Sequence, residues 1–172
     1  MTCSLPPRGI LDYLISITPI CIAAVVALIA IWQSKINKNK LRLDLYNRRF
    51  DIYSKTLDFY HTLLNFDGGG GSKSPERLHL YELQRNFIKS YRESRFLFDR
   101  MHGVFDILHE MNTRSFRIIG FKDHGQELAH SAPDKFKKMS AENIEDWKWL
   151  NDSIPRLEDA MARYLNFHRI VS

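Results

Sequence analysis

The chain has few cysteines and lacks the common catalytic motifs. Its 172 residues include only Cys3 and Cys21, which excludes a disulfide framework. It has no G-x-x-x-x-G-K-[ST], G-x-G-x-x-G, G-x-S-x-G or H-E-x-x-H sequence, the patterns of several nucleotide-binding and hydrolytic enzymes. His102 and His109 would share one helix face, but no Asp, Glu or Cys at metal spacing completes a ligand set. We therefore expect no cofactor, no metal site and no enzymatic activity.

One stretch also lacks charge. Residues 13–34 (YLISITPICIAAVVALIAIWQS) contain no Asp, Glu, Lys or Arg. An α-helix of this length covers about 30 Å, the thickness of the hydrocarbon core of a membrane. A cleaved signal peptide would carry its charge before a shorter apolar core, and a core helix of a soluble domain is rarely uncharged for this long. We predict a transmembrane helix over residues 13–34, preceded by a short extracytoplasmic N-terminus, residues 1–12.

Positive charge follows directly. Between residues 35 and 50 only Asp44 opposes six cations, so this segment carries the whole net charge of +5 and the remainder of the chain balances. Cations beside a span stay in the cytoplasm, which predicts a cytoplasmic C-terminal domain. Such a collar is more typical of contact with anionic lipid headgroups than of nucleic-acid binding. The collar consists of Lys35, Lys38, Lys40, Arg42, Arg48 and Arg49.

Small residues recur along the predicted span at steps of seven, four, three and four residues. Such steps place side chains on one stripe of a helix, and small side chains let membrane helices approach closely. We therefore expect a homo-oligomer, although alanine is common in any span. The stripe consists of Ser16, Ala23, Ala27, Ala30 and Ser34.

The rest of the chain predicts helices. Apolar and aromatic residues from Leu43 to Leu64 repeat every 3.5 residues, and this face either contacts other copies or packs on later helices of the same chain. A glycine run predicts a flexible linker over residues 68–74, and Ser74 with Pro75 is a typical helix start. The seam is Leu43, Tyr46, Phe50, Tyr53, Leu57, Tyr60 and Leu64.

Three further helices follow in this interpretation. They begin at Pro75, at Asp99 and at Ser140; the second ends near Gly120, with a loop over residues 120–139. The fold class is then all-α: one N-terminal transmembrane helix continues into a cytosolic bundle of about four helices. The collar and a long helix cover residues 35–67, and a cytosolic helical domain covers residues 75–172. The predicted inward-facing residues include Leu80, Leu83, Phe87, Tyr91, Met101, Val104, Phe105, Leu108, Met111, Ile144, Trp147, Ile154, Leu157 and Met161.

Three Arg–His pairs leave one enzymatic alternative open. Helical HEPN-type ribonucleases carry Arg and His separated by four to six intervening residues, the cation for the scissile phosphate and the imidazole for proton transfer. Composition alone predicts about two such pairs by chance, so we assign no catalytic site. A membrane-tethered HEPN-like ribonuclease that uses Arg163 and His168 is the alternative. The pairs are Arg95 with His102, Arg117 with His124, and Arg163 with His168.

Three sequence segments carry a resemblance. The order of KLRLDLYNRRFDIYSKTLDFY, YRESRFLFD and MARYLNF behind an apolar span resembles a group of uncharacterised bacterial single-pass proteins. More loosely, the layout is similar to the small membrane accessory proteins of type VI CRISPR systems, which pair one span with a divergent HEPN-like domain and assemble into a membrane pore. The resemblance implies a bacterial inner-membrane protein. We expect it to act by self-association or by docking a protein partner, as a membrane-perturbing or pore-forming accessory in phage defence, with membrane lipid as a partner and no nucleic acid.

Overall fold

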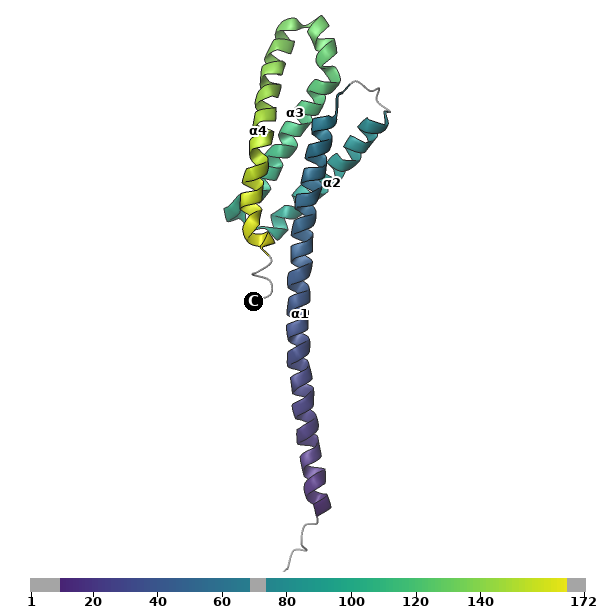
Figure 1. Cartoon of the computed structure of the whole chain (residues 1–172), viewed down its shortest axis with the longest axis vertical. Coiled ribbons are helices and arrows are strands. Elements are labelled where there is room, and N and C mark those ends of the chain that lie inside the picture. Colours follow the sequence, from purple (N-terminus) through teal and green to yellow (C-terminus); the bar gives the residue numbers. More distant parts are fainter. Residues whose placement is uncertain (1–9, 69–73, 167–172) are drawn as a thin grey trace, which may run out of the picture. The chain divides into compact units, whose positions relative to one another are not determined.

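The computed structural model describes residues 10–68 and 74–166, and within the first helix it describes no side chains at 10–16, 18 and 20 (Figure 1). The described residues form helices and contain no strand, which confirms the all-α prediction. The chain divides into two compact units, residues 1–43 and 44–172. The elements are α1 (Ile10–Asn65), α2 (Pro75–Leu97), a short 3-10 helix η1 (Arg100–His102), α3 (Val104–Ser131) and α4 (Pro133–Leu165).

The first unit contains the N-terminal part of α1, with Pro19 inside the helix. Every described side chain from Ile17 to Leu43 is exposed. The helix is long and apolar enough to cross a membrane, by length and composition.

In the second unit, the remainder of α1 packs with α2, α3 and α4 around one apolar core. The rings of Phe59 on α1 and Phe87 on α2 stack with centroids 4.9 Å apart. Figure 1 shows α3 running between α2 and α4, both of which it contacts. The core consists of Ile52, Phe59, Leu63, Phe66, Leu80, Phe87, Phe98, Val104, Leu108, Met111, Ile118, Ile119, Leu150, Leu157 and Met161.

The start of α2 was predicted correctly. The Ser74 hydroxyl accepts a hydrogen bond from the backbone N–H of Arg77 at 3.3 Å, and Pro75 occupies the first turn. A helix was also predicted to begin at Asp99, but Asp99 instead caps the short helix η1, where its Oδ1 accepts from the N–H of Met101 at 3.2 Å. Gly103, with φ +66°, then separates η1 from α3.

The predicted loop over residues 120–139 is wrong. Helix α3 continues through Gly120 to Ser131, and α4 begins at Pro133 rather than at Ser140. A helical glycine costs only about 1 kcal/mol, which packing can offset; the ring of Phe121 stacks on that of Phe136, 5.7 Å away. Proline is the stronger signal, because it disfavours helical geometry at the preceding residue.

The predicted seam on α1 does not coincide with its buried face. The buried residues are Ile52, Thr56, Phe59 and Leu63, whereas Phe50 is 49% exposed. Two tyrosines at the edge of this face reach α4, and an amphipathic ring suits such a boundary. Met101 and Ile144, predicted to face inward, are 86% and 67% exposed, so both predictions are wrong. Tyr53 Oη donates to Glu158 Oε1 at 2.6 Å, and Tyr60 Oη donates to Asn151 Oδ1 at 2.7 Å.

Candidate functional site

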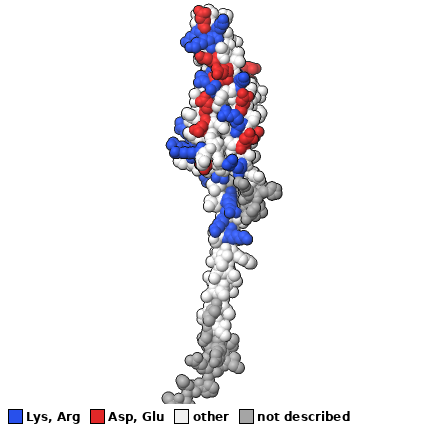
Figure 2. All heavy atoms as spheres, turned by 90° about the vertical axis from the view of Figure 1, so that its left-hand side faces the viewer, with Lys and Arg blue, Asp and Glu red and all other residues white. Residues whose placement is uncertain are grey.

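The apolar part of α1 is exposed on all sides. Ile22, Val26, Ile31 and Trp32 are between 59% and 72% exposed, and they point in different directions around the helix. Figure 2 shows this part of the surface free of Lys, Arg, Asp and Glu. A helix that is hydrophobic on every side is unfavourable in water and requires lipid or protein around it.

Of the six predicted collar residues, four lie in the first unit and are exposed. Lys35, Lys38, Lys40 and Arg42 make no ion pair with any described residue, so their charges are available to a ligand. Figure 2 shows positive charge next to the uncharged surface. Such an arrangement suits anionic headgroups.

The other two collar residues lie in the second unit and behave differently. Arg48 Nε lies 3.1 Å from Asp44 Oδ2 in an exposed pair. Arg49 Nε donates to the backbone oxygen of Leu97 at 2.9 Å, and its guanidinium stands over the ring of Tyr164, 4.7 Å away. Arg49 is thus held by the fold of the helical domain and is not presented to a headgroup in this conformation.

Part of the small-residue stripe borders a groove. Ala30 and Ser34, together with Gln33 and Lys38, line an open surface groove of about 440 Å³ that side chains of α1 alone form. Ala23 and Ala27 are exposed, while the side chain of Ser16 lies outside the described residues. Small side chains leave room for a second helix to approach.

The structure pairs Arg163 with a histidine other than the predicted one. His168 lies outside the described residues. Arg163 Nη1 instead lies 2.8 Å from Nε2 of His102, which is 61 residues away in the sequence. The spacing signal could not have found this pair, because it joins α4 to η1. Arg95, the sequence partner of His102, lies over the ring of Phe105 at 6.0 Å.

The Arg163–His102 contact belongs to a larger cluster. Tyr164 accepts a hydrogen bond from the N–H of Asp99 at 3.3 Å, and its ring meets the ring of Phe98 edge-on at 5.2 Å. Phe98 and Tyr164 also flank Arg49. The three sequence segments that carry the resemblance therefore meet at one place.

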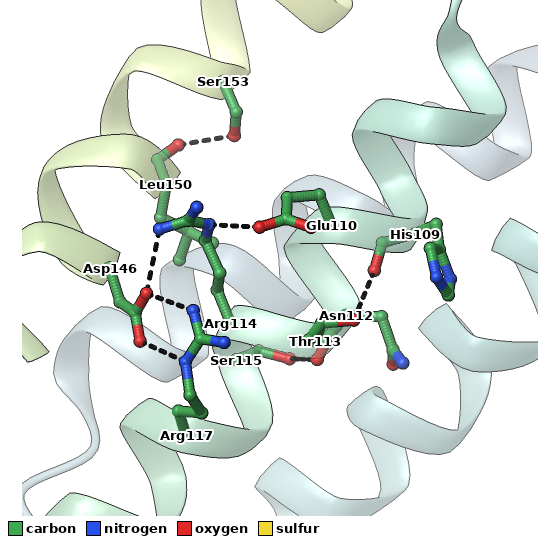
Figure 3. Close-up of polar contacts among 10 residues, drawn as sticks. All are labelled: His109, Glu110, Asn112, Thr113, Arg114, Ser115, Arg117, Asp146, Leu150 and Ser153. Atoms are coloured by element: carbon green, nitrogen blue, oxygen red, sulfur yellow. Dashed lines mark hydrogen bonds and ion pairs between the residues drawn. The ribbon is translucent and has the colours of Figure 1, made fainter. Parts of the chain in front are cut away.

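The third pair lines a cavity. Arg117 and His124 border a cavity of about 330 Å³ between α3 and α4, but Arg117 is engaged with Asp146 (Figure 3). Its Nε and Nη2 donate to the two carboxylate oxygens at 2.7 and 2.5 Å, and this hydrogen bonding raises the pKa of Arg117. Arg114 Nη1 donates to the same carboxylate at 2.9 Å, and Arg114 Nε donates to Glu110 at 2.7 Å.

This network serves the fold. Asp146 is 4% exposed, and its charge is compensated by Arg114 and Arg117 across the α3–α4 contact. A buried carboxylate requires such compensation. Arg117 is therefore a structural cation in this conformation rather than a free phosphate ligand.

Within the described residues, no group of three or more His, Cys, Asp or Glu is placed to hold a metal ion. His109, one of the two histidines considered for a metal, stacks on the ring of Phe105 with centroids 6.0 Å apart. No protein-family model, curated protein or solved structure matches the chain.

Proposed function

We propose that the protein is a single-pass membrane protein of the bacterial inner membrane, with its N-terminus outside and its helical domain in the cytoplasm. The observation that carries this proposal is the exposed apolar helix followed by four cations, Lys35 to Arg42, that make no ion pair with a described residue. A bilayer covers the apolar surface, and cytoplasmic headgroups meet the cations.

Self-association at the membrane is the activity that we propose for it. The support is the groove beside Ala30 and Ser34, which lies on the stripe of small residues. The resemblance in layout adds the proposal that the assembled protein perturbs the membrane in phage defence, either alone or through a docked partner.

Topology is the direct test. A fluorescent protein fused after Ser172 is expected to fluoresce, and alkaline phosphatase fused at the same place to be inactive. Alkaline phosphatase fused before Asp12 is expected to be active, with the protein retained in membranes after carbonate extraction. The reverse pattern, or release by carbonate, contradicts the anchor and its orientation.

One observation keeps the ribonuclease alternative open. The contact of Arg163 with His102 brings a guanidinium and an imidazole together at 2.8 Å. In this contact the two groups engage each other, whereas catalysis would need both of them free. We therefore expect the variants Arg163→Ala, His102→Ala and His168→Ala to keep the protein's phenotype. Loss of the phenotype at unchanged levels of folded protein would favour the ribonuclease.

A further inference from the structure

The cavity between α3 and α4 extends well beyond the Asp146 network at one of its ends. It has a volume of about 330 Å³, and its surface is mostly apolar. Phe121 and Leu128 on α3 and Met139 on α4 contribute apolar side chains to the lining. A volume of this size lies at the lower end of the range for small-molecule sites. Water inside the cavity would find few polar partners, so an apolar ligand is favoured there.

Gly120 enlarges this cavity. The residue lies inside α3 without a positive φ, and a Cβ added to it would meet no atom within 4 Å. Neither the backbone geometry nor close packing therefore requires a glycine here, although glycine lowers helix stability by about 1 kcal/mol relative to alanine. Because Gly120 is a lining residue, the space that its missing side chain leaves belongs to the cavity.

The two ends of the cavity differ in charge. Helices α3 and α4 run antiparallel on either side of Ala132 (Figure 1). Lys135 therefore lines the end near this turn, and Arg117 with Asp146 lines the other end. Lys135 is exposed and makes no ion pair with a described residue. Glu142, the other acid of the lining, lies one turn before Asp146 and thus towards the Arg117 end.

Two further acids lie near the turn, but they do not line the cavity. Asp134 precedes Lys135, and Glu127 Oε2 lies 4.0 Å from Nδ1 of His124. Neither Asp134 nor Glu127 belongs to the lining, whereas His124 and Lys135 do. The end near the turn is therefore suited to an anionic group, and the opposite end, with Glu142, is not.

We propose that this cavity binds a medium-chain carboxylate, with the carboxylate at Lys135 and the apolar chain along Phe121 towards Gly120. Along α3, Leu128 and Gly120 are about 12 Å apart, a length that the chain of decanoate matches. The chain covers the apolar lining and fills the space beside Gly120. This site lies in the helical domain and does not depend on the proposed self-association.

Photo-cross-linking in nanodiscs tests the site. Full-length protein is incubated with decanoic acid that carries a diazirine at the end of its chain, and labelled peptides are identified by mass spectrometry after irradiation. Label is expected on α3 around Gly120 or on α4 around Asn143, which also lines the cavity. Unlabelled decanoate is expected to compete for this position.

Two substitutions of Gly120 test the depth of the cavity. Gly120→Ala is expected to lower labelling about fourfold and Gly120→Leu at least about tenfold, because each displaced methylene changes the affinity by a factor of about four. Circular dichroism checks that both variants keep their helical content. Gln126→Leu adds apolar bulk at an exposed position outside the lining and is expected to leave labelling unchanged.

Lys135→Gln tests the position of the carboxylate. It is expected to lower labelling by the acid about threefold, in keeping with the loss of one exposed ion pair. Labelling by the corresponding alcohol, a decanol with the same diazirine, is expected to remain unchanged. Lys137→Gln, at an exposed position outside the lining, is the matched control.

Three results would overturn this proposal. Label confined to the apolar part of α1 would show that the probe remains in the bilayer. Label on α3 or α4 that persists in Gly120→Leu at wild-type helical content would show that the cavity is not occupied. An equal effect of Lys135→Gln on the acid and the alcohol would exclude a carboxylate at this position. None of these results depends on the oligomer mass, so self-association is tested separately.

Discussion

Asp146 shows how one buried charge organises the contact between α3 and α4. The carboxylate accepts hydrogen bonds from two arginines (Figure 3). Arg114 also stands over the ring of Trp149, 4.8 Å away. The desolvation of such a group is unfavourable, so its partners restore a charge balance more than they add net stability. Removing one partner should therefore lower the free energy of unfolding more than replacing both partners by apolar residues.

Asp146→Ala is therefore expected to lower the free energy of unfolding by about 3 kcal/mol, since it leaves Arg114 largely buried with Glu110 as its remaining acidic partner. The double variant Asp146→Leu with Arg114→Met is expected to lose less. Chemical denaturation in detergent, followed by tryptophan fluorescence, measures both values. A double variant less stable than the single one would contradict this account, and the exposed Glu142→Gln serves as a control.

At the scale of the element, α1 shows how far a repeat can mislead. The 3.5-residue pattern predicted a helix correctly but selected the face that carries Phe50, whereas the fold buries Ile52, Phe59 and Leu63. A sequence repeat identifies every apolar stripe, and only the partner helices decide which stripe is covered. The same limit explains Ile144, whose apolar side chain lies on the outward face of α4.

Truncation of the two aromatic residues distinguishes these faces. Phe59→Ala removes a ring that is 2% exposed and stacks on Phe87, so we expect a loss of about 3–5 kcal/mol in the free energy of unfolding. Phe50→Ala removes a ring that is 49% exposed and is expected to cost less than about 1 kcal/mol. Denaturant midpoints of the two variants give the comparison, and equal losses would argue against the observed core.

The contact between α1 and α4 also predicts a pH dependence. The hydrogen bond to Glu158, followed by burial, raises the pKa of Tyr53 from 10.0 to about 12. The folded state therefore holds this proton more tightly than the unfolded state. The contribution to stability is complete below pH 10 and is lost as the pH rises from 10 towards 12.

Tyr53→Phe is accordingly expected to cost about 0.5–1 kcal/mol at pH 9 and to cost less at pH 11. The measurement is the difference in denaturant midpoint between wild type and variant at the two pH values. Tyr81→Phe, whose hydroxyl has no hydrogen bond to a described residue, controls for general alkaline effects. A difference that stays constant or grows at pH 11 would mean that the Tyr53–Glu158 bond does not form.

At the scale of the whole molecule, local signals predicted the elements better than the site. Ser74 identified the start of a helix, and the uncharged run identified an apolar segment, because neighbouring residues in the sequence determine both features. The contact between Arg163 and His102 depends on the packing of α4 against η1, so no spacing rule could predict it. For the same reason Arg49 was assigned to the collar by its sequence neighbours, while the fold holds it against Leu97 and Tyr164.

The proposed close packing of the spans leads to the last prediction, on the stripe that includes Ala27. Ala27→Leu adds bulk where neighbouring helices would approach most closely, yet it keeps the helix apolar enough to insert. We expect the variant to associate at least about tenfold more weakly than wild type, because a loss of about 1.4 kcal/mol of packing suffices for that change.

Val25→Leu is the matched control for Ala27→Leu, because it adds bulk about 160° away around the helix; Val25 is itself 55% exposed. The oligomer mass in nanodiscs, determined over a range of protein concentrations, compares the three proteins. A monomeric wild type would refute self-association. An oligomer that is equally stable in Ala27→Leu and in wild type would assign the contact to the helical domain.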